Sequence, residues 1–193
     1  MTKTLILAFH RDLTKSKANA ALLKAAEAVE GVEIVDVQAR YPDGLIDWTR
    51  DTPAEAARLL AADRLVFQFP IQWYSVPPLM KTWLDAVLTV MYYIKAEELG
   101  DRLVGTPLMI AATAGNVPTA YARDGGNHYT IDEIMTPLKA TAHRCGLPWH
   151  EPYVVFEADR LDAAQLDTAG AAYVRKLEDF VAATPAPIEG VAA

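Results

Sequence analysis

The sequence of 193 residues contains a single cysteine, Cys145, so no disulfide can form within the chain and a cysteine-rich metal site is excluded. A small buried apolar residue is a more common role for such a cysteine than a nucleophile. Basic residues are also few, 18 lysines and arginines against 25 acidic residues, and they form no basic block. The resulting net charge of −7 argues against nucleic acid as a partner.

Long apolar segments are missing too. No stretch approaches the length that spans a bilayer, and the apolar run near the N-terminus is too short for a signal peptide. We therefore expect a soluble, cytoplasmic protein. The overall hydrophobic content of 52% is nevertheless sufficient for one well-buried core. This predicts a single domain over residues 1–183, followed by a disordered tail over residues 184–193, where prolines recur.

Short apolar segments alternate with longer amphipathic ones along the chain. The expected strands are 4–9, 32–37, 65–69, 108–112 and 153–156. The expected helices are 19–29, one that begins at Thr52, 79–90, 131–145 and 163–183. Strands that alternate with helices form a parallel sheet covered on both faces. The order predicts an α/β, flavodoxin-like fold, a three-layer sandwich with five parallel strands.

The segment that follows the third expected strand changes abruptly in character. After Pro70 come an amide, two large aromatics and a hydroxyl, in the order Ile71, Gln72, Trp73, Tyr74 and Ser75. In open α/β sheets, ligands bind beyond the carboxyl ends of the strands. A stiff aromatic loop there favours a flat, conjugated cofactor. The alternative is that the aromatics only fill their own edge of the core.

The segment after the first strand is polar and precedes a helix. It runs from His10 through Ser16 and Lys17 to Asn19. The first amides of a helix lack partners and attract phosphate. A simple helix cap at Ser16 or Asn19 is an equally good interpretation. No Gly-x-x-x-x-Gly-Lys-Ser/Thr run is present and no Gly-x-Gly-x-x-Gly follows the first strand. A mononucleotide therefore fits better than a nucleoside triphosphate or a dinucleotide.

The loop after the fourth expected strand, residues 113–129, is rich in glycine and asparagine. In such a sheet the loops after the first, third and fourth strands open on the same edge, so we expect all three to meet there. Small residues allow the backbone to approach a ring closely. Tyr121 and His128 add a phenol and an imidazole, which could deliver a proton to a substrate that is reduced by hydride. A lone loop histidine is more often structural, so this role stays one of two alternatives.

Together these segments resemble the flavodoxin-like NAD(P)H quinone oxidoreductases, the group that includes DT-diaphorase. The chain is most similar to the ancillary quinone-reductase subunits of bacterial glutathione-gated potassium efflux systems. The matching pieces are His10 with 16–19, the turn 41–43, the block 68–83, and 137–142 with 145–147. They span nearly the whole chain, and the central block is the most specific of them.

The resemblance implies a set of cofactor contacts. The flavin ring would be held by Pro70, Ile71, Gln72, Trp73 and Tyr74, and the other ring edge by Thr113, Ala114, Gly115 and Asn116. The phosphate and ribityl side would lie at His10, Ser16, Lys17, Ala18 and Asn19. Tyr121 and His128 would border the hydride-transfer pocket as catalytic residues. FMN is the expected flavin rather than FAD, because the C-terminal extension that contacts the adenine end of FAD in longer enzymes is missing.

The sequence departs from this family in one place. The family usually has Thr-Thr-Gly-Gly where this chain has Thr113-Ala114-Gly115-Asn116, so a hydroxyl is lost and a side chain enters near the ring. The sequence therefore does not determine the redox potential of the flavin or the size of its pocket. The choice between NADPH and NADH is open as well, with Arg11 and Arg123 as candidate contacts for a 2′-phosphate.

The resemblance implies an FMN-dependent NAD(P)H:quinone oxidoreductase with ping-pong turnover. It also implies a homodimer. Aromatic residues such as Trp83, Tyr92 and Tyr93 could form its interface, although core packing explains these residues equally well. Two alternatives remain. The first is a regulatory ancillary subunit of a potassium efflux transporter, which would place the protein at the inner membrane through its partner. The second is an FMN-dependent azo or nitro reductase.

Overall fold

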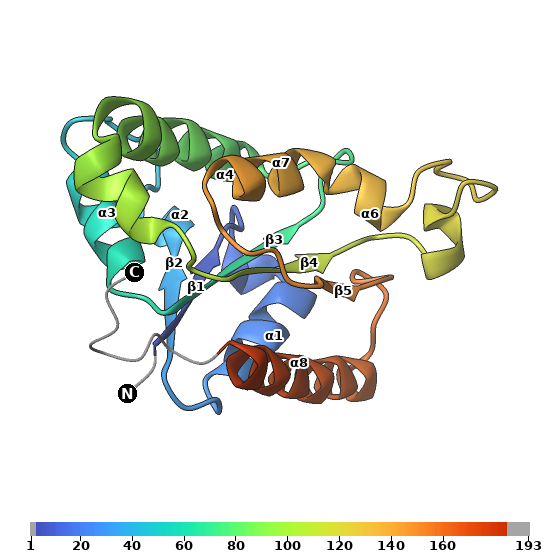
Figure 1. Cartoon of the computed structure of the whole chain (residues 1–193). Helices are drawn as coiled ribbons and strands as arrows, with labels where there is room; N and C mark the ends of the chain where they lie inside the picture. Colours follow the sequence, from blue (N-terminus) through green and yellow to red (C-terminus); the bar gives the residue numbers. More distant parts are fainter. Residues whose placement is uncertain (1–2, 185–193) are drawn as a thin grey trace.

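The computed structural model describes residues 3–184 and contains a five-stranded parallel sheet (Figure 1). The strands are β1 (Thr4–Ala8), β2 (Val32–Asp36), β3 (Arg64–Pro70), β4 (Leu108–Thr113) and β5 (Tyr153–Val155). Their order across the sheet is β2-β1-β3-β4-β5. The predicted α/β, flavodoxin-like architecture is therefore confirmed, and the central strands β1, β3 and β4 are almost fully buried because helices cover both faces.

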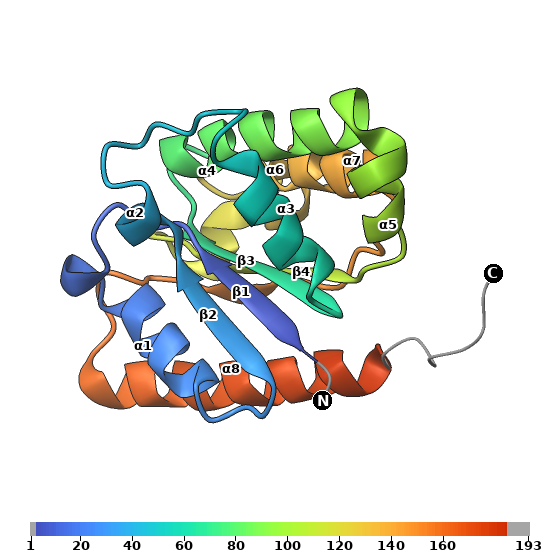
Figure 2. The same cartoon turned by 90° about the vertical axis from the view of Figure 1, so that its left-hand side faces the viewer.

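Two helices, α1 (Ala18–Ala26) and α8 (Ala163–Ala183), cover one face of the sheet (Figures 1 and 2). They pack closely because Gly170 lies in the middle of α8. A Cβ atom at Gly170 would come within 3.0 Å of the Ala25 methyl group on α1. A glycine in a helix interior costs about 1 kcal/mol relative to alanine. Here the absence of a side chain at Gly170 permits the close contact of the two helices.

Further helices complete the fold, and of these α3, α4 and α7 cover the opposite face of the sheet (Figure 1). Their bounds are α2 (Val37–Arg40), α3 (Thr52–Leu60), α4 (Pro78–Trp83), α5 (Asp101–Leu103), α6 (Ile131–Ile134) and α7 (Thr136–Arg144). The larger of the two hydrophobic clusters lies under them and is centred on Phe9, Phe67 and Trp83. These three rings contact one another edge to face, with centroids 5.7 to 6.0 Å apart.

Two predicted helices differ from the observed ones. The helix expected over 79–90 changes at Leu84 into wider π-helical turns, η2 (Leu84–Leu88), η3 (Val90–Ile94) and η4 (Ala96–Gly100). Gly100 permits η4 to lie against η3, since a Cβ there would be 2.7 Å from the Met91 carbonyl oxygen. The helix expected over 131–145 is divided at Met135. Pro137 has no N–H to continue the hydrogen-bond ladder, so α7 starts anew beside it.

Several boundaries also differ by a few residues. β3 includes Pro70, which was expected to end it, and β4 extends to Thr113; the two residues are register partners. The helix expected to begin at Asn19 begins at Ala18 and ends at Ala26. Thr184, expected in a disordered tail, is buried and its hydroxyl accepts a hydrogen bond from Arg64 Nε at 2.6 Å. Residues 185–193 of that predicted tail lie outside the described residues.

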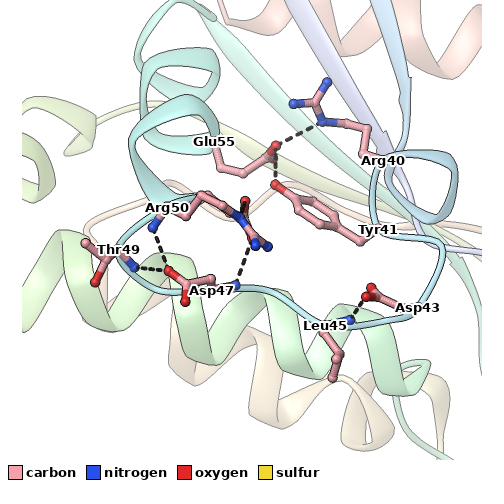
Figure 3. Close-up of polar contacts among 9 residues, drawn as sticks. Arg40, Tyr41, Asp43, Leu45, Asp47, Thr49, Arg50 and Glu55 are labelled. Carbon is pink, nitrogen blue, oxygen red and sulfur yellow. Dashed lines mark hydrogen bonds and ion pairs between the residues drawn. The ribbon is translucent and has the colours of Figure 1, made fainter.

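A buried carboxylate joins α2, α3 and α4. The Glu55 side chain is fully buried and accepts hydrogen bonds from Arg40 Nε at 3.1 Å and the Tyr41 hydroxyl at 3.0 Å (Figure 3). It accepts a third from Trp83 Nε1 at 3.0 Å. These donors compensate for the loss of hydration. Burial and the neighbouring Glu55 charge raise the pKa of Tyr41 to about 12. The network fixes the chain on both sides of the connecting segment 42–51.

Within residues 3–184, no helix is both long and apolar enough to cross a membrane.

Candidate functional site

The loops after β1, β3 and β4 meet at the carboxyl edge of the sheet, as predicted. Asn19 Nδ2, at the start of α1, donates a hydrogen bond to Thr113 Oγ1 at the end of β4, over 3.0 Å. Gln68 Nε2 on β3 donates to the Asn19 carbonyl oxygen at 3.0 Å. All three side chains are buried. This polar cluster fixes the position of α1 relative to both strands, because each of the three segments contributes one member.

The aromatic loop forms a tight turn that projects from this edge. Gln72 and Ser75 exchange two backbone hydrogen bonds, of 2.9 and 3.0 Å. The two central residues, Trp73 and Tyr74, have left-handed backbone angles, with φ of 47° and 61°. Such angles cost roughly 1–2 kcal/mol for each residue other than glycine. The Trp73 side chain is 95% exposed. A large aromatic held in a strained turn and left in solvent indicates a binding surface rather than a core contact.

A cavity of about 200 Å³ lies between this turn and the loop after β4. It is lined by Ile71, Trp73, Tyr74, Gly115, Asn116, Tyr121 and Asn127. The Tyr74 hydroxyl lies 3.3 Å from Asn127 Oδ1 and bridges the two walls. Six of these residues were candidates from the sequence. Asn127 was missed, although its place next to His128 in a loop rich in glycine and asparagine was a usable signal.

Four further candidates lie below or beside the cavity. Thr113 and Ala114 are buried under the loop, and the Ala114 N–H donates to the Val155 carbonyl oxygen. Gln72 is exposed and contributes its backbone to the turn. Pro70 ends β3 directly beneath the turn. Their contribution is to position the cavity walls.

The start of α1 carries the residues expected to bind a phosphate. The Ser16 hydroxyl accepts a hydrogen bond from the Asn19 N–H at 3.2 Å, so it does act as a cap. The same hydroxyl retains its proton as a donor, and the side chain of Lys17 is exposed beside it. The remaining N–H groups of the first turn, with the positive end of the helix dipole, suit an anion. Capping and phosphate binding are therefore compatible.

His10 stands at the end of β1 beside this helix start. Its Nδ1 accepts a hydrogen bond from the Asp12 N–H at 3.1 Å, which requires an unprotonated Nδ1. Burial lowers the pKa of His10, while its contact with Asp12 acts in the opposite direction. The neutral ring keeps Nε2–H as a hydrogen-bond donor for a ligand.

The two candidate catalytic residues are placed differently. Tyr121 lines the cavity, and its ring contacts Phe156 at a centroid distance of 5.6 Å. His128 is exposed with a left-handed φ of 60°, and its Nδ1 lies 3.4 Å from the Arg123 carbonyl oxygen. It does not line the cavity but follows Asn127, which does. The guanidinium of Arg123, a candidate 2′-phosphate contact, is paired with Glu133.

The cavity fits a flavin in two respects. A Cβ at Gly115 would find no heavy atom closer than 3.9 Å, so the glycine leaves the surface open for a flat ring. At the family departure, the Asn116 Oδ1 accepts a hydrogen bond from the Val117 N–H at 2.9 Å. The additional side chain is thereby held within its own loop. Aromatic and amide walls next to a helix start suit a ring joined to a phosphate.

Known proteins are similar to this chain in sequence and in fold. A family model described as the flavodoxin-like fold matches residues 2–179. A Cronobacter sakazakii protein, the glutathione-regulated potassium-efflux system ancillary protein KefG, is 37% identical over 177 residues. That match covers 92% of this chain and 93% of KefG. The predicted resemblance is therefore confirmed.

Solved structures are similar over nearly the whole chain. General stress protein 14 from Treponema denticola, solved in complex with FMN, has a TM-score of 0.78 and 28% identity, covering 92% of this chain and 98% of its own. A Klebsiella pneumoniae protein proposed to be a quinone reductase has a TM-score of 0.78 and 25% identity. That match covers 93% of this chain and 85% of the Klebsiella protein. A structure described as a tryptophan halogenase from Streptomycin violaceusniger has a TM-score of 0.81 and 35% identity, covering 90% and 97%.

The sheet order, the three converging loops and the match over residues 2–179 agree. This chain belongs to the family of proteins with the flavodoxin-like fold, and KefG and quinone-reductase-like proteins are among its relatives.

Proposed function

We propose that this protein is an FMN-dependent NAD(P)H:quinone oxidoreductase. The observation that carries the proposal is the 95% exposed Trp73, held in a strained turn at the wall of a cavity that opens on the carboxyl edge of the sheet. A flat conjugated ring would cover this aromatic surface. The FMN complex of the related general stress protein 14 and the likeness to a proposed quinone reductase support the same conclusion.

Each part of the site would then have a separate task. The turn at Trp73 and Tyr74 and the loop 113–116 would hold the ring, while His10 and the start of α1 would hold the phosphate. Bound FMN supplies the capacity to accept and release a hydride. The net reaction converts NAD(P)H, a proton and a quinone into NAD(P)⁺ and a hydroquinone. Donor and quinone would use the same open side of the cavity in turn, which gives ping-pong kinetics.

The first experiment is a visible absorption spectrum of the protein after saturation with FMN and desalting. Anaerobic addition of NADPH or NADH in separate samples then identifies the donor by bleaching of the flavin. A quinone added next should restore the spectrum. Retained flavin that neither donor bleaches would contradict the oxidoreductase proposal, and failure to retain flavin would contradict the cofactor site.

Tyr121 and His128 are proposed to deliver the proton that the quinone requires. Replacement of His128 with glutamine should lower quinone turnover about tenfold or more, since general acids typically contribute 10²- to 10⁴-fold, while the flavin content stays the same. His143→Gln is the matched control because His143 is exposed on α7, remote from the cavity. Equal turnover in the His128 and His143 variants would remove His128 from the mechanism.

We also propose that the protein forms a homodimer. Trp83 is fully buried and Tyr92 is nearly so, hence core packing explains both, whereas Tyr93 is 70% exposed. Tyr93 and the exposed Ile94 belong to η3, next to a groove of about 660 Å³ that separates η3 and η4 from α3. Trp48 borders the groove as well. Light scattering should report a dimer, and Ile94→Asp should shift it to a monomer. A monomeric native protein would contradict this assignment.

The KefG likeness supports a second candidate function, that of an ancillary subunit of a potassium efflux transporter. Co-purification with a membrane transporter in the absence of quinone turnover would favour it. An azo or nitro reductase on the same scaffold is the third candidate, and it predicts faster turnover with azo or nitro acceptors than with quinones.

A further inference from the structure

A second cavity lies behind the aromatic turn, on the side of α4 and α7. It has a volume of about 120 Å³. Its walls come from the turn, from η2 and from the α6–α7 junction, and they include Ile71, Val76, Leu84, Ile134, Met135 and Leu138. The division between α6 and α7 at Met135 forms one side of this cavity.

Two of the polar side chains at its border are already engaged. Lys81 Nζ lies 2.5 and 2.6 Å from the two carboxylate oxygens of Asp85. The Thr141 hydroxyl donates to the Pro137 carbonyl oxygen at 2.9 Å. The remaining surface is mainly apolar, so the cavity suits a hydrocarbon group rather than a charged one. Met135 adds an adaptable wall, because a thioether side chain can adopt several rotamers.

Ile71 lines both this cavity and the proposed ring site, so the two cavities adjoin at this side chain. A quinone stacked on the flavin ring beside Ile71 would need to extend its substituent only past this side chain to reach the apolar space. Apolar cavities of about 150 Å³ bind benzene, so a cavity of 120 Å³ is of the size for a branched group of roughly five carbons.

We propose that this cavity binds the hydrocarbon substituent of the quinone acceptor, such as one prenyl unit, while the quinone ring stacks on the flavin at the open side of the adjoining ring site. The inference rests on the proposed function and specifies its substrate class: ring-alkylated quinones rather than unsubstituted or polar ones. Leu138 and Met135 are then specificity-determining residues, since they contact the substituent and not the reacting ring.

The test compares two acceptors on the FMN-loaded protein, 2,3-dimethoxy-5-methyl-1,4-benzoquinone with and without a prenyl group at the free ring position. Each buried methylene contributes about 0.8 kcal/mol, or roughly a fourfold gain in affinity. The KM of the prenylated quinone should therefore be about tenfold or more below that of the parent. Equal KM values, with turnover of both quinones, would overturn the inference and leave the proposed function intact. If the protein turns over neither quinone, the proposed function is overturned, and this inference with it.

Two variants that fill the cavity test whether the prenyl group binds there. Leu138→Phe and Thr141→Leu each add bulk at the cavity, and both should remove most of the prenyl advantage without changing the KM of the parent quinone. Thr141 is only partly buried, so we expect Thr141→Leu to fold. The test can then still be made with this variant if Leu138→Phe does not fold. Ala140→Leu is the control, because Ala140 is exposed on the same helix. A prenyl advantage that persists in both filling variants would place the substituent elsewhere.

Discussion

Asn19 and Thr113 are 94 positions apart in the sequence, yet the side-chain amide of Asn19 donates a hydrogen bond to Thr113 Oγ1 at 3.0 Å inside the protein. Gln68 completes the contact through the Asn19 carbonyl oxygen. The bond connects the start of α1, proposed to hold a phosphate, to the end of β4, proposed to line the ring. The site therefore depends on a buried polar cluster as well as on its exposed surface.

Replacement of Thr113 with valine should show this dependence. Valine has nearly the same shape but leaves the buried Asn19 amide without its acceptor, which costs about 1–3 kcal/mol of unfolding free energy. Urea unfolding measures the loss, and FMN affinity should fall with it. Thr113→Ser keeps the hydroxyl and should retain most of the stability. A valine variant as stable as the native protein would show that the bond contributes nothing.

Glu55→Gln tests the buried carboxylate that joins α2, α3 and α4. Removing one partner of a buried ion pair costs about 3–5 kcal/mol. The loss here should lie below this range, at about 2–3 kcal/mol, because the Arg40 side chain is 38% exposed and can be hydrated. Lys81→Gln, which breaks an exposed pair with Asp85, should change the unfolding free energy by less than about 1 kcal/mol. Similar losses in both variants would contradict the special role of Glu55.

Trp73→Ala separates binding from stability. The side chain is 95% exposed, so its removal should change the unfolding free energy by less than about 0.5 kcal/mol. Loss of an aromatic contact with the ring should raise the Kd for FMN about three- to tenfold. Fluorescence titration with FMN measures the affinity. Trp48→Ala removes a partly exposed tryptophan outside the ring site and should leave the Kd unchanged; an equal Kd in the Trp73 variant would exclude that residue from the flavin site.

The cofactor-free protein should lose stability as the pH falls below the ordinary histidine pKa of 6.5. The pKa of His10 is lowered by burial, so below pH 6.5 the unfolded chain binds more protons than the folded one. The unfolding free energy then decreases with falling pH until the folded pKa is passed. One group contributes at most about 1.4 kcal/mol per pH unit.

The His10→Asn variant isolates this contribution. Asparagine keeps an acceptor for the Asp12 N–H but has no proton to bind. Urea unfolding between pH 7 and 5 should give a flatter profile for the variant than for the native protein. His150, whose pKa is also lowered by burial, is present in both proteins and cancels in the difference. Parallel profiles would show that His10 does not titrate differently on folding.

The sequence by itself determined the parallel sheet, the order of its elements and the edge at which the three loops of the candidate site meet. Apolar segments of strand length that alternate with helical periodicity leave few other arrangements, and Pro77 and Pro78 indicated the start of α4 correctly. The division of the predicted helix 131–145 was also encoded locally, by Pro137. The residues around the cavity were found because three loops with unusual compositions had to meet at one edge.

Only the tertiary structure decided which side chains face the site and which lie beneath it. Trp73 and Trp83 are ten residues apart and chemically identical, yet the first is 95% exposed and the second is fully buried against Phe9 and Phe67. The difference arises from the left-handed turn at Trp73 and from the Glu55 carboxylate that accepts the Trp83 N–H. Such contacts join residues distant in the chain, and local pattern contains no information about them. The same reason explains why Asn127 and the apolar cavity behind the turn appeared only once the chain was folded.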